Sequence, residues 1–116
     1  MQISRFDAQA GRLIDRFESS GAVVTPVARP ATMQAVVMHI APAGVVGYHQ
    51  ATYNQLFLVV AGQGWVRGES PERTPIAAGQ AAFWSAGEWH ESGSDTGMMA
   101  VVLEGPELIP LLPPQE

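Results

Sequence analysis

The chain has 116 residues, which is enough for one domain with a substantial buried core. Its net charge of -5 and the lack of a basic cluster argue against nucleic acid as a partner. It contains no cysteine, which excludes disulfides, thiolate metal sites and cysteine nucleophiles. No apolar run is long enough to span a bilayer and no signal peptide is recognisable, so we expect a cytoplasmic protein with no membrane partner.

The first expected element is an N-terminal arm over residues 1–21. Apolar residues recur at roughly helical spacing between positions 4 and 19, with Ser4 as a candidate cap and Gly21 as a stop. Gly11 weakens the helical pattern, so a short helix and an irregular arm both remain open. In either form, we expect this arm to cover an apolar patch of the domain.

From residue 22 onward the pattern changes to short β-prone runs separated by turns rich in glycine and proline. In chain order these runs are AVVTPVA, MQAVVMHI, GYHQA, QLFLVVA, GWVRG, QAAFW, WHESG and GMMAVVLE. No amphipathic helix separates them, so residues 22–105 are expected to form an all-β barrel or sandwich. The last segment, 106–116, contains four prolines and should run extended over the surface.

Two of these runs, residues 56–61 and 98–103, are apolar at odd and at even positions alike, so both faces of each strand are apolar. A strand of this kind is covered on both of its faces. Charged residues make up only 15% of the chain, against about a quarter in typical domains. One face would look into the barrel, and the other would pack against the arm or a second subunit. We therefore expect a homodimer.

The clustered histidine chemistry lies in two segments, GVVGYHQATYNQLFLVVAG at 44–62 and GQAAFWSAGEWHESG at 79–93. Each joins a histidine to an apolar strand closed by glycine. We expect His49, Gln55 and His90 to converge inside the barrel as the place for chemistry.

Strand alternation then turns Phe57 toward the same interior as Gln55, and Ser92 toward the same interior as His90. Tyr48, Tyr53 and Trp89 adjoin the motif histidines, so we expect these rings to wall the pocket of a small apolar or ring-shaped ligand. His39 is a further candidate nitrogen, with a structural histidine as the commoner alternative.

The first histidine segment resembles the first motif of the cupin superfamily. That motif has His-x-His, a glutamate three or four residues later, and a glycine beyond six more residues. Here His49 takes the first histidine position, Ala51 the second and Gln55 the glutamate position, and Gly62 closes the motif.

The second segment resembles the second cupin motif, in which a glycine is followed by Pro-x-Gly, a histidine and an asparagine. Gly79, Gly87 and His90 keep this spacing, while Ser85 and Ser94 stand where the proline and the asparagine would be. The resemblance covers about residues 33–104.

The resemblance implies a single-domain double-stranded β-helix, the jelly-roll barrel, and a divalent metal held by three histidines and one glutamate. His49 and His90 match two of these ligands, Gln55 offers a neutral amide oxygen, and Ala51 cannot ligate. The metal prediction is therefore a transition metal ion (Fe, Zn, Mn, Ni or Cu) at His49, Gln55 and His90, bound with less charge than is usual for the family.

Because this barrel hosts many activities, its fold does not fix its function. The first hypothesis is a small-molecule-binding cupin whose pocket holds His49, Gln55 and His90 and has room for a divalent metal. If it is an enzyme, the expected class is a metal-dependent oxidoreductase or isomerase that acts on a small organic compound. The alternative is a ligand-binding, sensor or storage cupin without metal or catalysis, which the changes at positions 51 and 55 favour. A purely structural dimer is the third reading.

Overall fold

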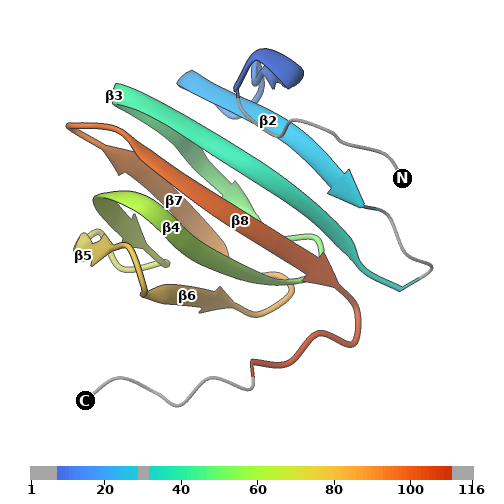
Figure 1. The fold of residues 1–116 in the computed structure, drawn as a ribbon. Coiled ribbons are helices and arrows are strands. Elements are labelled where there is room, and N and C mark those ends of the chain that lie inside the picture. The colour runs from blue at the N-terminus through green and yellow to red at the C-terminus, as the bar shows by residue number, and fades with distance from the viewer. Residues whose placement is uncertain (1–7, 29–31, 111–116) are drawn as a thin grey trace, which may run out of the picture.

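The computed structural model describes residues 8–28 and 32–110, which form an almost entirely antiparallel β protein (Figure 1). The elements in chain order are a short 3-10 helix η1 (Ala8–Ala10), β1 (Arg12–Leu13), β2 (Ser20–Ala28), β3 (Gln34–Gln50), β4 (Asn54–Arg67), β5 (Thr74–Ala77), β6 (Ala81–Trp84), β7 (Trp89–Ser94) and β8 (Met98–Gly105). Within these ranges, no helix has the length and apolar character needed to cross a membrane.

The eight strands form one hydrogen-bonded sheet that bends into two layers, called here the two sheets, and β3 and β4 are long because each contributes to both. The first half of β3 pairs with β2 and β8, and its second half pairs mainly with β7. The first half of β4 pairs with β6 and β8, and its second half pairs with β5 and β7. The two sheets enclose one interior, which confirms the predicted all-β jelly-roll barrel.

Both long strands change sheet at a residue with positive φ. Ala43 has a φ of 64° at the bend of β3, and Gly62 has a φ of 78° at the bend of β4. A Cβ atom at Gly62 would overlap the carbonyl oxygen of Gly97, so this bend requires glycine. The sequence pattern placed a turn at each of these points, whereas the structure has one continuous bent strand.

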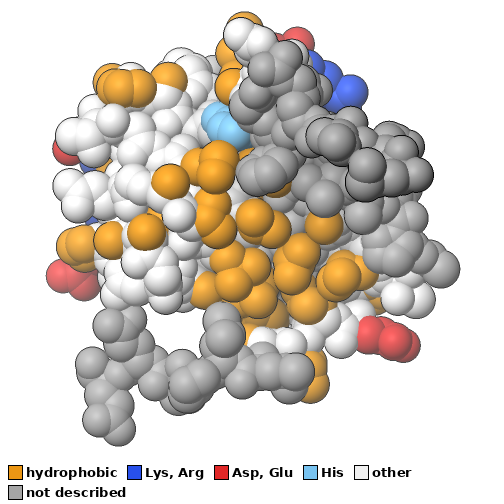
Figure 2. Space-filling model, viewed as in Figure 1, with side chains coloured by type: hydrophobic (Ala, Val, Ile, Leu, Met, Phe, Trp, Pro, Cys, Tyr) orange, Lys and Arg blue, Asp and Glu red, His pale blue; other side chains and the backbone are white. Residues whose placement is uncertain are grey.

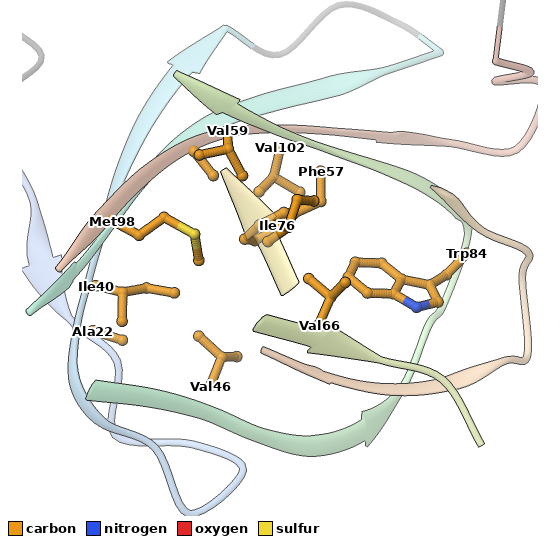
Figure 3. Packing of buried hydrophobic residues seen from close by; sticks show 11 residues of the cluster. Ala22, Ile40, Val46, Phe57, Val59, Val66, Ile76, Trp84, Met98 and Val102 are labelled. Carbon is orange, nitrogen blue, oxygen red and sulfur yellow. The ribbon is translucent and has the colours of Figure 1, made fainter. Parts of the chain in front are cut away.

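The inner faces of the two sheets form one hydrophobic core, and Figure 3 shows its side chains pointing toward a common centre. Phe57 and Val59 on β4 and Val102 on β8 are each less than 5% exposed. These residues alternate with outward-facing neighbours, as expected for strands that line a barrel.

The outer face of the sheet that contains β8 is also apolar. Leu58 on β4 and Val101 and Leu103 on β8 alternate with the buried core residues, and Val60 is 47% exposed. Figure 2 shows apolar side chains gathered across β8 and its neighbours on this face. This face explains why both alternations of these strands are apolar, and the homodimer stays a prediction.

The N-terminal arm is irregular over residues 8–19, so the helical alternative is wrong there. Its 3-10 helix has three residues, and β1 adds a two-residue pairing with β2. Phe17 and Glu18 have φ values of 59° and 54°, which an α-helix does not accept. The parts of the predicted arm and tail at residues 1–7 and 111–116 lie outside the described residues.

Candidate functional site

The two motif histidines meet because β3 carries a β-bulge just before His49. Val46 pairs with Ser92, and the next pair in the ladder is His49 with His90, so β3 holds one extra residue between the two pairs. Simple alternation from the buried Val46 would have turned Tyr48 inward. The bulge turns His49 inward in its place.

His49 and His90 belong to a row of four rings across one end of the barrel. Their ring centroids lie 4.4 Å apart at an interplanar angle of 55°. Phe17 stacks on His49 at 4.0 Å and 13°, and Trp84 stacks on His90 at 4.3 Å and 24°. Each imidazole is therefore held between two other rings, which fixes its orientation.

Backbone carbonyls select the protonated nitrogen of each imidazole. Nδ1 of His49 donates to the carbonyl of Gly47 at 2.7 Å, and Nδ1 of His90 lies 3.4 Å from the carbonyl of Glu88. A neutral imidazole that donates through Nδ1 keeps a lone pair on Nε2. In this form the pair offers hydrogen-bond acceptors.

His90 is uncharged at neutral pH. Its pKa is lowered from 6.5 to about 4, mainly by burial and secondly by the charge of His49, against an opposing contribution from the Glu88 carbonyl. The residue is only 3% exposed, so water cannot stabilise an imidazolium there.

A cavity of about 360 Å³ opens beside this row of rings. Val36, Phe57 and Val102 form an apolar wall, and they are register neighbours on three adjacent strands. The polar residues that line the cavity from the barrel strands include Gln34, His49, Gln55, His90, Ser92 and Glu104. The structure therefore brings His49, Gln55, His90, Phe57 and Ser92 to one cavity, and their roles stay predictions.

Three predicted pocket residues do not line this cavity. Tyr48 and Trp89 adjoin inward-facing histidines, so alternation turns both rings outward, where they stack on each other at 5.3 Å. Tyr53 lies in the turn between β3 and β4 and is 46% exposed. The expectation that these rings wall the pocket is corrected by this geometry.

His39 also points away from the cavity. Gln34, Val36 and Met38 of β3 line it, and His39 falls on the alternate positions of the same strand. His39 is therefore not a third nitrogen of this site.

Glu104 and Trp84 are cavity residues that the sequence analysis did not select. Glu104 on β8 pairs with Gln34 on one side and Gln55 on the other, and it accepts a hydrogen bond from Gln55 Nε2 at 3.3 Å. Trp84 on β6 pairs with Gln55 and is 4% exposed. Alternation along β8 from Met98 would have placed Glu104 on the inner face.

The donor set fits a resident divalent ion poorly. Across residues 8–28 and 32–110, no group of three or more histidine, cysteine, aspartate or glutamate side chains gathers to hold a metal. Gln55 contributes a neutral amide already bonded to Glu104, and Ala51 lines the cavity with a methyl group. Protein zinc sites use three or four protein ligands, whereas two imidazoles are present here. The metal at His49, Gln55 and His90 stays a prediction.

A strap formed by residues 14–19 closes one side of the cavity and carries Phe17 onto His49. The carbonyl oxygen of Phe17 lies directly over Gly47, where a Cβ atom would overlap it. The Gly47 amide also donates to the Ser19 hydroxyl at 3.3 Å. Gly47 thus permits the close approach that seats the strap.

Gly47→Ala is expected to destabilise the protein by about 2 kcal/mol, because the new methyl group forces the strap away from β3. Urea unfolding measures the loss, and amide hydrogen exchange should quicken at residues 14–19 first. Ser19→Ala removes only one hydrogen bond and should lower stability by about 1 kcal/mol or less. Equal stability and equal exchange in Gly47→Ala and the parent protein would contradict this account of the strap.

Comparison with known proteins identifies structures of the same fold. No family model matches the chain, and no curated protein matches it. Three solved structures with TM-scores of 0.69 to 0.76 are among those that match.

The polyketide cyclase RemF from Streptomyces resistomycificus aligns with a TM-score of 0.76 at 14% identity, over 94% of this chain and 83% of its own. A predicted oxalate decarboxylase from Thermotoga maritima aligns with a TM-score of 0.75 at 15% identity, over 89% of this chain and 99% of its own. An RmlC-like cupin from Shewanella frigidimarina aligns with a TM-score of 0.69 at 18% identity, over 79% of this chain and 86% of its own. Identities this low establish the fold and leave the activity open. The chain therefore has the fold of the cupin superfamily.

Proposed function

We propose that the protein binds a small organic molecule in the barrel cavity, with a polar group of the ligand on the imidazole pair. The observation that carries this proposal is the neutral, packed His90 beside His49 at a cavity of about 360 Å³. Small-molecule pockets in proteins measure about 300–1,000 Å³ and combine apolar walls with a few placed polar groups. This cavity has both features.

The geometry favours a ligand with a hydrogen-bond donor attached to an apolar body. Val36, Phe57 and Val102 offer an apolar wall, and the Nε2 lone pairs of the imidazoles accept hydrogen bonds. Stacking on Phe17 and Trp84 already fixes both imidazoles, so little side-chain entropy is lost when a ligand binds.

Ligand binding without catalysis accounts for these residues better than metal-dependent oxidation or isomerisation. An imidazole with a pKa of about 4 accepts a hydrogen bond but is a weak base at neutral pH. The metal-dependent alternative needs a divalent ion on His49, Gln55 and His90, and those residues lack the charged ligand that such sites use. A binding, sensor or storage role is therefore the function we propose.

Benzyl alcohol, which joins one ring to one hydroxyl, is the probe that tests this proposal. In a two-dimensional NMR titration it is expected to give saturable amide shifts at cavity-lining residues. His90→Leu keeps a similar volume against Trp84 but removes the acceptor nitrogen, and should weaken binding by roughly threefold to tenfold.

His39→Leu is the matched control, because His39 lies on the opposite face of β3. The affinity of this variant for benzyl alcohol should equal that of the parent protein. Shifts that never saturate, or equal affinity in the His90→Leu protein, would count against binding at this cavity.

A further inference from the structure

Glu104 is a carboxylate that faces the cavity, and among residues 8–28 and 32–110 it has no cationic partner. It is half-buried on the inner face of β8, and it accepts a hydrogen bond from the amide nitrogen of Gln55 at 3.3 Å. Within the described part of the chain, no arginine or histidine pairs with it. A carboxylate has about four acceptor positions, so one amide leaves most of its hydrogen-bonding capacity unused.

The described arginines that line this cavity form no ion pair with Glu104. Arg12 and Arg16 line its rim from the N-terminal arm, where both are exposed and Asp15 lies between them in the chain. Arg16 stands over the ring of Phe17, with its guanidinium carbon 5.0 Å from the ring centroid. Exposed rim charges are screened by water and salt, whereas a half-buried charge inside the barrel is screened less.

Glu104 also lies apart from the imidazole pair. The three side chains do not form a cluster that could hold one metal ion, although all of them line the same cavity. Glu104 lies two residues beyond Val102 on the same face of β8, between strands β3 and β4. Its carboxylate is therefore next to the apolar wall. A cationic group at Glu104 would therefore place an attached apolar body against that wall.

We propose that Glu104 determines the class of ligand. The cavity then prefers small organic amines whose protonated nitrogen binds this carboxylate, an inference that rests on the proposed function. Gln34 and Gln55 are the register neighbours of Glu104 on the two adjacent strands, and neither carries a charge that would compete with a ligand cation. The net charge of -5 adds a favourable long-range field for cations. A ligand carboxylate in the same place would face Glu104 and be repelled.

Three probes of nearly equal shape test this preference: benzylamine, benzyl alcohol and benzoate. In NMR titrations of the parent protein, we expect benzylamine to bind most tightly and benzoate most weakly, with a difference of at least about tenfold. Glu104→Gln keeps the size of the side chain and an acceptor oxygen for Gln55. This substitution should lower the affinity for benzylamine by about tenfold and change the affinity for benzyl alcohol by less than about threefold.

Asp15→Asn is the matched control, because it removes a carboxylate from the exposed rim of the same cavity and should leave the benzylamine affinity nearly unchanged. Benzoate binding as tightly as benzylamine, or an unchanged benzylamine affinity in Glu104→Gln, would overturn the role of Glu104. Saturable benzyl alcohol binding in that case would still uphold the proposed function, whereas failure of all three probes would end both proposals. The ranking of probes on the parent protein needs no variant, so it stands even if Glu104→Gln folds poorly.

Discussion

His90→Leu is expected to flatten the pH dependence of stability between pH 6.5 and 4. In the unfolded chain this imidazole has a pKa near 6.5, and in the folded protein its pKa is about 4. Between these values, the unfolded chain binds a proton that the folded protein does not. The contribution of His90 to stability is therefore complete above pH 6.5 and is lost as the pH falls toward 4. The loss amounts to about 3 kcal/mol, a large share of the stability of a small domain.

Urea unfolding at a series of pH values from 7 to 4 measures this effect. Carboxylates change the stability of both proteins in the same range, so the informative quantity is the difference between the parent protein and His90→Leu at each pH. Ser92→Ala removes a neighbouring buried polar group and keeps the titrating imidazole, so it should follow the parent curve. If the curves of His90→Leu and the parent run parallel from pH 6.5 to 4, then His90 is protonated in the folded protein as readily as in the unfolded chain.

The fold could be predicted from sequence because its signals are local and repeated. Short apolar runs with glycine punctuation indicate a barrel, and the two spaced motifs identify which barrel. The bends at Ala43 and Gly62 were interpreted as strand ends because a glycine-containing turn and a bent strand have the same local sequence pattern. The arm was harder to predict, because Phe17 and Glu18 adopt positive φ values that their side chains do not favour. Contacts with Gly47 hold them there, and these contacts are not visible in the local sequence.

Some residues of the candidate site could likewise be predicted from the sequence, and others could not. His49 and His90 could be placed together because motif spacing carries that information. Tyr48 was misplaced because it was selected for its adjacency to His49, although that adjacency turns it to the opposite face of the strand. Trp89 could have been placed correctly, since a neighbour of an inward-facing strand residue points outward. Alternation along β8 from Met98 would have placed Glu104 on the inner face, whereas its position between Gln34 and Gln55 depends on long-range strand pairing.

A metal site is expected to form when Ala51→His and Gln55→Glu are combined. Ala51 is 5% exposed and lines the cavity, and its backbone is anchored by hydrogen bonds with Glu88 at 2.9 Å and Gly87 at 2.8 Å. An imidazole there would join the His49 and His90 rings, and a carboxylate at 55 would supply the missing charge. Three nitrogens and one carboxylate oxygen make a donor set that zinc and nickel ions bind well.

Calorimetry on protein without a polyhistidine tag should show zinc affinity on the order of 100-fold higher in this double variant than in the parent. Without metal, the new carboxylate lies beside Glu104, where Gln55 now donates a hydrogen bond at 3.3 Å. Repulsion between these carboxylates should lower the stability of the metal-free variant, and zinc should restore it.

Tyr53→His is the matched control for added imidazole, because residue 53 is exposed and outside the cavity, and it should bind zinc no better than the parent. The comparison also decides between the two functional hypotheses. If the parent protein already binds zinc as tightly as the double variant, then two imidazoles and an amide suffice, and the metal-dependent enzyme becomes the better account. If only the double variant binds zinc tightly, then the changes at positions 51 and 55 have removed the metal from a barrel that keeps its cavity, which is the arrangement expected of a binding protein.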